Sequence, residues 1–567
     1  MRQNRNYHTA LLLTPAVMLG FLPSSGLATT FSLEEATIAD INGAFDAGAL
    51  SSEQLTQLYL NRIEAYDKQG PSLNSIITIN SNALEAAAEL DKERQTSGPR
   101  SPLHGVPVIL KDNYNTFDLP TTAGALALEG FVPTSDAFQV QKLRDAGAVI
   151  LGKANLSEFA FSFSTESSLG GVTLNPYDPN RTPGGSSGGT GTAIAANFGA
   201  IGLGTDTGGS IRIPSTFNSL VGVRPTIGLS SRDGIIPLAL SQDVGGPMTR
   251  TVADAAVTLD ATVGYDPKDP ATAASIGKIP QSYTQFLDPN GLQGTRIGVV
   301  RDLFEQDSNP EAAKVNTVVN QAIEDMRGLG AEIVDSVTIS NLDRILAYPS
   351  LSGFEFKFNL NDYLAEQPNA PVRTLEEIIA SGGYLPSNEA TLRTRNSRES
   401  LENNPEYQDI IQNRPALTQQ AILTALEEND LDALIYPTST QPPALLGQSI
   451  VTGTANRLSP FSGFPAISVP VGFTPEGLPV GIEFLGEAFS EPTLLQLTYA
   501  YEQGTLNRLS PTTTPPLPGE VFEYEPVPEP SPVVGLTVIG IAALGLQIKQ
   551  RRQGNCAIAT SSTNNFL

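Results

Sequence analysis

The chain has 567 residues, 40% of them hydrophobic, with 51 glycines and 43 prolines, a composition that supports a large folded core with many tight turns. The formal net charge is −25, from 34 basic and 59 acidic residues, which argues against a nucleic-acid partner because phosphate contacts need a basic face. One cysteine and two histidines argue against a disulfide framework and against a zinc site, so no metal or other cofactor is expected.

Residues 1–28 have the pattern of a secretory signal peptide. Two arginines precede the apolar run 10–22, and small residues follow up to Ala28. The run has 13 residues, whereas a membrane-spanning helix needs about 20. We therefore expect cleavage after Ala28 rather than a membrane helix.

Residues 29–510 are expected to form one α/β domain. Ser51 and Gln54 have the spacing of a capping box at the start of a helix, and a second helix is expected near 136–145, with Gly147 ending it. Helices between strands imply crossover connections, so we expect a large mixed, mostly parallel sheet covered by helices on both faces. Apolar runs predict strands at 106–110, 148–151, 201–204, 296–300, 433–436, 466–470 and 480–484.

Lys111 directly follows the first of these strands. Burial disfavours the charged ammonium and lowers the pKa of a lysine, so a buried Lys111 would accept a proton near neutral pH. For a lysine considered alone, a side chain that reaches water is the better interpretation. Two serine segments further along the chain reverse that preference. Lys153, which follows another strand, is interpreted as structural.

The two serine segments are 184–189, with Ser186 and Ser187, and 204–212, with Ser210. A serine hydroxyl needs a base to take its proton, and outside the predicted signal peptide the only histidine is His104. The small residues before Ser210 allow several backbone N–H groups to point at one site, as an oxyanion hole requires.

These three segments resemble the motifs of the amidase signature family of serine hydrolases. Lys111 and Ser186 are 75 residues apart, and Ser186 and Ser210 are 24 apart. The resemblance extends from about residue 36 to 503, and it implies one α/β/α domain around a large mixed sheet. Further motifs that carry it lie at 120–124, 146–155, 175–177, 222–228, 241–247, 463–468 and 477–481.

The resemblance also implies roles for individual residues. Lys111 would be the base, Ser186 would relay the proton and follow a cis peptide bond, and Ser210 would be the nucleophile that forms an acyl-enzyme. Asp206 and Arg212 would shape the turn, and Ser187 would be structural. The oxyanion hole would consist of the backbone N–H groups of Thr207, Gly208, Gly209 and Ser210.

The segment from about residue 264 to 430 is less patterned. It includes the aromatic run 354–358 and the polar stretch 386–415. Two interpretations stay open: helical elaboration of the surface, or the wall of the substrate pocket on the acyl side.

The C-terminus divides into three parts. Residues 511–532 are rich in proline and acid and predict an extended linker. Residues 533–552 combine an apolar run with a basic cluster and resemble the PEP-CTERM sorting signal that an exosortase processes in the bacterial envelope. The alternative is a tail anchor, which would give membrane contact through this segment alone. Residues 553–567 form a polar tail. The expected location is the periplasm, the envelope or the outside of the cell.

Three functions remain open. The first is an exported serine amidase that cleaves a small-molecule or peptide amide through Ser210, with esterase activity as a side reaction. The runs 234–237 and 241–243 resemble members that remove C-terminal amides from peptides. The second is an A-type subunit of an aminoacyl-tRNA amidotransferase, which the signal peptide and the charge disfavour. The third is a non-catalytic envelope binding protein, which the presence of Lys111, Ser186 and Ser210 disfavours.

Overall fold

An eleven-stranded mixed sheet runs through the structure, a computed structural model that describes residues 28–527. Residues 30–522 form one folded unit. From one edge of the sheet to the other, the strands are β11 (Glu332–Asp335), β10 (Arg296–Val299), β12 (Ala433–Pro437), β14 (Pro479–Leu485), β13 (Ala466–Phe473), β8 (Val221–Arg224), β9 (Val244–Thr249), β7 (Ile201–Asp206), β3 (Pro107–Lys111), β4 (Val149–Ala154) and β2 (Ile76–Ile79). Two small sheets pair β1 (Thr29–Ser32) with β15 (Val521–Tyr524) and β5 (Glu166–Ser167) with β6 (Gly171–Val172).

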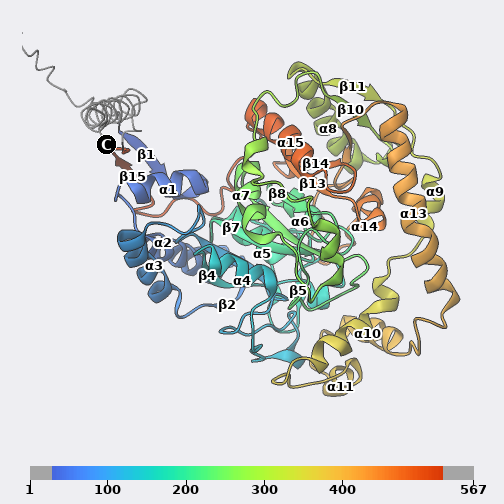
Figure 1. Cartoon of the computed structure of the whole chain (residues 1–567), viewed down its shortest axis with the longest axis horizontal. Helices are drawn as coiled ribbons and strands as arrows, with labels where there is room; N and C mark the ends of the chain where they lie inside the picture. The colour runs from blue at the N-terminus through green and yellow to red at the C-terminus, as the bar shows by residue number, and fades with distance from the viewer. Residues whose placement is uncertain (1–27, 528–567) are drawn as a thin grey trace, which may run out of the picture. The chain divides into compact units, whose positions relative to one another are not determined.

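Helices cover both faces of this sheet, as predicted (Figure 1). On β12, Ile435 packs into a core cluster with α7, α8 and α15, whereas its neighbours Leu434 and Tyr436 pack with α13 and α14. This alternation is the period of two expected for a strand that is buried on both faces. The α-helices of the described residues are α1 (Ile38–Asp46), α2 (Ser52–Arg62), α3 (Ala83–Ser97), α4 (Phe138–Asp145), α5 (Gly188–Ala195), α6 (Arg212–Phe217), α7 (Val252–Thr262), α8 (Pro310–Gly328), α9 (Leu342–Ala347), α10 (Ser352–Ala365), α11 (Leu375–Ser381), α12 (Glu389–Asn396), α13 (Pro405–Glu428), α14 (Leu458–Ser462) and α15 (Glu491–Thr505).

The predicted helix ends are present. The Ser51 side chain accepts a hydrogen bond from the N–H of Gln54, and the Gln54 side chain accepts one from the N–H of Ser51, so the capping box is complete. α4 is followed by Gly147 at φ +87°, the left-handed conformation in which glycine commonly ends a helix.

The large mixed sheet is confirmed, but the expectation that it is mostly parallel is wrong. Four of the ten neighbouring strand pairs of the described sheet are parallel and six are antiparallel. Consecutive strands β13 and β14 form a hairpin with no helix between them. Four strands of this sheet were not predicted from the sequence: β2, β8, β9 and β11.

β9 shows why a strand was missed. Its sequence contains Gly245, Gly246 and Pro247 in succession, a composition typical of a turn. In the structure a Cβ on Gly245 would lie 2.4 Å from the Tyr114 hydroxyl, and one on Gly246 would lie 2.3 Å from the Val223 carbonyl oxygen. The glycines are therefore required by close packing inside the sheet.

The predicted linker begins too early. The segment up to Phe522 belongs to the folded unit, and Glu520 in this segment forms a buried ion pair with Arg62 at 2.7 Å. Arg62 Nη2 also donates to the Thr514 carbonyl at 2.6 Å. A buried arginine needs such partners, so residues 511–522 are part of the domain rather than an extended tether.

Both predicted targeting segments lie outside the described residues, apart from Ala28. Within residues 28–527, the structure contains no helix with the length and apolar character needed to cross a membrane.

Candidate active site

The three sequence segments meet at one end of the central strands. Lys111 is the last residue of β3, Ser186 lies just before α5, and Ser210 lies in the turn between β7 and α6. Parallel pairing of β3 with β7 places Leu110 opposite Leu203, which brings the end of β3 next to Thr205. Lys111 Nζ donates to Ser186 Oγ at 2.7 Å and to Thr205 Oγ1 at 2.7 Å.

Lys111 is fully buried. Desolvation lowers the pKa of Lys111 to about 7, although the negative charges of Asp206 and Asp243 oppose the shift. The ion pairs of the described residues do not include Lys111 with any carboxylate. Near neutral pH a large fraction of this side chain is therefore a neutral amine that can accept a proton.

Asp206 and Arg212 hold the turn that carries Ser210. Asp206 accepts hydrogen bonds from the N–H groups of Gly209 at 2.8 Å and Ile211 at 3.1 Å, and from Arg212 Nε at 3.0 Å. The guanidinium groups of Arg212 and Arg224 hold the pKa of Asp206 well below its usual range. The carboxylate thus stays ionised and fixes the turn that carries Ser210.

Three of the four predicted oxyanion donors are unengaged. Within residues 28–527, the N–H groups of Thr207, Gly208 and Ser210 have no hydrogen-bond acceptor. Gly209 is the exception, since its N–H donates to Asp206 Oδ1 at 2.8 Å and is not free to bind an oxyanion in this conformation. Its contribution is conformational: φ of +128° favours glycine.

The serine pair separates into two environments. The Gly185–Ser186 peptide bond is cis, as the resemblance implies, and Ser186 Oγ faces Lys111. Ser187 Oγ donates to the Thr205 carbonyl and accepts from the Thr205 N–H, both at 3.2 Å. Ser187 therefore ties the start of α5 to β7, which fits the structural role assigned to it.

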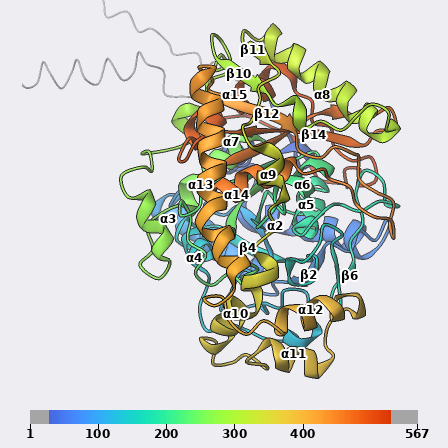
Figure 2. The same cartoon turned by 90° about the vertical axis from the view of Figure 1, so that its right-hand side faces the viewer.

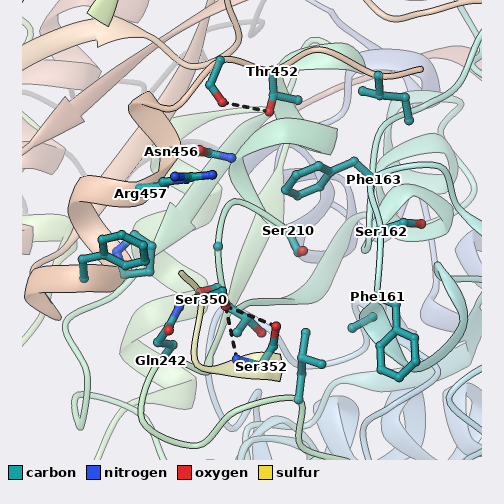
Figure 3. A pocket seen from close by; sticks show the side chains of 18 of the residues that line it. Phe161, Ser162, Phe163, Ser210, Gln242, Ser350, Ser352, Thr452, Asn456 and Arg457 are labelled. Atoms are coloured by element: carbon teal, nitrogen blue, oxygen red, sulfur yellow. Dashed lines mark hydrogen bonds between the residues drawn. The ribbon is translucent and has the colours of Figure 1, made fainter. Parts of the chain in front are cut away.

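Ser210 opens onto a cavity of about 590 Å³ (Figure 3). Thr207 and Gly208 of the turn line it together with Ser210, and Phe161 and Phe163 contribute an aromatic wall. This volume lies within the ~300–1,000 Å³ range of small-molecule sites.

The segment 264–430 contributes Ser350 and Ser352 to this cavity. Ser352 begins α10, which is grouped with α11 and α12, and the long helix α13 extends away from this group (Figure 2). The segment therefore reaches the cavity at these two serines, and the assignment of this wall to the acyl side stays a prediction.

Sequence reasoning missed three polar residues of the site. Thr205 Oγ1 accepts from both Lys111 Nζ and Asn113 Nδ2, the latter at 3.1 Å. Asp243 accepts from the Thr207 hydroxyl at 2.5 Å, and burial raises the pKa of Asp243 to about 6. Asn456 lines the cavity. Thr205 and Asp243 lie within the motifs at 204–212 and 241–247, which is the signal that could have identified them, whereas Asn456 lies in no motif.

The remaining candidates have structural contacts. Lys153 Nζ pairs with Asp112 at 3.2 Å, which agrees with its interpretation as structural. His104 is buried, with Nε2 2.9 Å from the Leu90 carbonyl oxygen and Nδ1 accepting from the Arg100 N–H. Across the described part of the chain, no group of three or more His, Cys, Asp or Glu side chains is arranged to hold a metal ion.

Comparisons with known proteins identify the family. The model of the amidase family matches residues 54–495. The chain belongs to the amidase family. A probable amidase from Arabidopsis thaliana is 39% identical over 525 residues, which cover 88% of this chain and 96% of the relative. A glutamyl-tRNA(Gln) amidotransferase subunit from Myxococcus xanthus is 37% identical, with 83% of this chain and 97% of that relative covered.

Solved structures agree with the fold. A native peptide amidase from Stenotrophomonas maltophilia superposes with a TM-score of 0.78 at 41% identity, covering 84% of this chain and 99% of its own. An amidase family protein from Bacillus anthracis gives a TM-score of 0.76 at 36% identity, covering 84% and 92%. The chain is thus an amide-hydrolysing enzyme of the amidase fold.

Proposed function

We propose that this protein is a serine amidase in which Lys111, Ser186 and Ser210 perform the chemistry. The observation that carries the proposal is the 2.7 Å hydrogen bond from Lys111 Nζ to Ser186 Oγ. Lys111 is buried and forms no ion pair with a carboxylate of the described residues, and the neighbouring turn presents Ser210 to the cavity. Neutral Lys111 takes the proton of Ser186 as Ser186 takes the proton of Ser210.

The reaction follows from this arrangement. Ser210 Oγ attacks the amide carbonyl carbon, and the N–H groups of Thr207, Gly208 and Ser210 stabilise the oxyanion, each donor contributing about 2.7–4 kcal/mol at the transition state. The C–N bond breaks, the amine leaves with the proton held by Lys111 and Ser186, and the acyl group stays on Ser210. Water then attacks the ester while Ser186 and Lys111 take one of its protons. The pair passes that proton to Ser210 Oγ as the C–O bond of the acyl-enzyme breaks and the carboxylic acid leaves.

The experiment is a comparison of wild-type protein with S210A and S187A. Wild type should hydrolyse an amide and should be labelled by a fluorophosphonate on Ser210. S210A should lose both properties and keep its thermal unfolding temperature, whereas S187A should retain labelling. Turnover by S210A, or labelling at another residue, would reject the assignment.

For the substrate we propose a C-terminal peptide amide. The 41% identity to a peptide amidase supports this choice, as do the runs 234–237 and 241–243. A panel of aliphatic, aromatic and peptide amides tests it: the peptide amides should have the highest kcat/KM, and a preference for simple aliphatic amides would exclude it.

A second candidate is a role within an amidotransferase, favoured by the 37% identity to the Myxococcus xanthus amidotransferase subunit. The net charge of −25 disfavours a complex that handles tRNA. Release of ammonia from glutamine, measured with and without the other amidotransferase subunits, separates the two: activity only in the assembled complex would favour the second candidate.

We also propose export directed by residues 1–28, with sorting or anchoring by residues 533–552. The sequence patterns alone support this proposal. Mass spectrometry of fractionated cells tests it, since the mature chain should begin after Ala28 and occur in the envelope or outside. A full-length cytosolic chain that retains Met1 would refute it.

A further inference from the structure

The cavity in front of Ser210 carries a single charged side chain among the residues that the structure describes. Arg457 is that residue, and the others that line the space are apolar, small or neutral polar residues. No aspartate or glutamate of residues 28–527 lines it. The chain as a whole has a net charge of −25. The charge of the side chains that line this cavity is instead positive.

Arg457 is only partly engaged by the protein. Its Nη1 donates to the Leu346 carbonyl oxygen, and no carboxylate of residues 28–527 lies within ion-pair distance of it. An arginine presents five N–H donors, so most of this guanidinium is available to a ligand. By contrast, Arg212 beside the site is saturated by Asp206 and Glu483.

The position of Arg457 is set by a short helical turn. Ala455, Asn456 and Arg457 form the 3-10 helix η9 directly before α14. Figure 3 shows Asn456 and Arg457 side by side, with both side chains pointing into the cavity toward Ser210. The Asn456 carbonyl accepts from Arg212 at 3.1 Å, so the element that carries Arg457 is attached to the same arginine that holds the Ser210 turn.

A second cation reinforces the positive potential. Arg395 stacks on the ring of Phe161, which lines the opposite wall, with its guanidinium 3.9 Å from the ring centroid. Its Nη1 is buried and has no hydrogen-bond partner in the described part of the chain. Both walls therefore favour an anionic ligand group over a cationic one.

We propose that Arg457 determines specificity by binding a carboxylate on the acyl part of the amide substrate. This inference rests on the proposed serine amidase function and narrows its substrate class to amides with an acidic side chain near the scissile bond. A planar guanidinium binds a carboxylate through two parallel N–H···O bonds. Arg457 acts here on substrate binding, and the proton transfers stay with Lys111 and Ser186.

The test uses acetylated dipeptide amides that differ at one residue. Acetyl-Xaa-Ala-amide and acetyl-Ala-Xaa-amide are made with Glu, Gln or Lys as Xaa. Wild type should prefer Glu over Gln by about tenfold or more at one of the two positions, as expected for a charge-assisted pair, and Lys should be the poorest. The preference should appear in KM rather than kcat, and it should decrease at high salt.

Three variants test the residue itself. R457Q should bring the Glu-to-Gln ratio to about one, R457K should retain part of it, and R457E should favour Lys. R327Q is the matched control, because Arg327 on α8 is exposed and its loss changes the net charge equally. A Glu-to-Gln ratio that is the same in wild type and R457Q at both positions would overturn the inference, as would an equal loss for all three peptides.

Binding to S210A separates this inference from the proposed chemistry. Titration calorimetry with S210A and S210A/R457Q measures affinity for the Glu and Gln peptide amides without turnover. Tighter binding of the Glu peptide to S210A, lost in the double variant, supports the inference even if catalysis follows another route. Hydrolysis of the Gln peptide with equal binding of both peptides would overturn the inference and leave the amidase function intact.

Discussion

Two buried lysines stand at the ends of neighbouring parallel strands, and they differ in their partners. Lys111 of β3 and Lys153 of β4 are both 0% exposed. Lys153 pairs with Asp112 at 3.2 Å and donates to the Tyr114 carbonyl at 2.7 Å. Lys111 donates to hydroxyls at 2.7 Å and has no carboxylate partner among the described residues. Burial lowers the pKa of both lysines. Lys153 is held in an ion pair with Asp112, whereas Lys111 contacts the Ser186 hydroxyl, so only Lys111 is placed to act as a base.

The pleat of the two strands explains this division. Leu110 pairs with Lys153, and Lys111 pairs with Ala154, so the two lysine side chains leave opposite faces of the sheet. Asp112, one residue beyond Lys111, points to the face of Lys153. A carboxylate adjacent in sequence to Lys111 is thereby directed to the structural lysine, and Lys111 keeps its lowered pKa.

Replacement of Lys111 should have the largest effect on activity. K111A should lower kcat by about 10²–10⁴-fold, the usual contribution of a general base, because Ser186 then has no acceptor for its proton. Thermal unfolding should show a folded protein that is less stable by about 1–3 kcal/mol, because the buried hydrogen bonds to Ser186 and Thr205 are lost. Steady-state kinetics measures the loss. A K111A variant that keeps near wild-type kcat would contradict the assignment of Lys111 as the base.

Replacement of Lys153 should instead lower stability. K153M leaves Asp112 buried without its partner, and breaking a buried pair in this way costs about 3–5 kcal/mol. Chemical denaturation measures the free energy of unfolding. The fraction that remains folded should retain kcat within a few-fold, and a variant that is as stable as wild type but inactive would transfer the catalytic role to Lys153.

The sequence predicted the three reacting side chains better than it predicted the residues and strands that surround them. Lys111, Ser186 and Ser210 can be found from the sequence because they lie in short motifs: Lys111 follows an apolar strand, and each serine lies among glycines. The spacing of these motifs resembles that of the amidase signature family. Lys153 and Lys111 both follow predicted strands. The resemblance to the amidase signature family separates them in the sequence, and the register of β3 against β4 separates them in the structure. Asn456 lines the cavity from η9, far along the chain from the serine motifs, so no local pattern marks it. β9 looks like a turn because its glycines are required by close packing against Tyr114 and Val223.

The pH dependence of kcat/KM should also distinguish the two lysines, with a smaller change in rate than the K111A substitution causes. Burial lowers the pKa of Lys111 to about 7, so the neutral base is present above that pH and is lost as pH falls through it. We expect kcat/KM to decrease about tenfold per pH unit below about 7, before Asp243, with a pKa near 6, also takes up a proton. Initial rates between pH 5 and 9 measure the profile.

The control for this profile is the residual activity of K111A, which should lack the inflection near 7. The inflection should persist in K153M, because Lys153 takes no part in proton transfer. A wild-type profile that is flat between pH 5 and 8, or an inflection that disappears only in K153M, would contradict the assignment.

The smallest expected effect on activity concerns His104, the only histidine of the described residues. Histidine is the usual partner of a nucleophilic serine, so its replacement tests whether a lysine has taken that place. His104 lies against the Leu90 carbonyl and the Arg100 N–H and forms no hydrogen bond with Lys111, Ser186 or Ser210. H104A should keep kcat within about twofold while losing about 1–3 kcal/mol of stability, the cost of leaving buried polar groups unsatisfied.

Kinetics at a temperature well below unfolding, with fluorophosphonate labelling of Ser210 as the measure of intact sites, separates the effect on activity from the effect on stability. An inactive H104A that is still folded, beside an active K111A, would replace the lysine base with a histidine and would leave both buried lysines with structural roles alone.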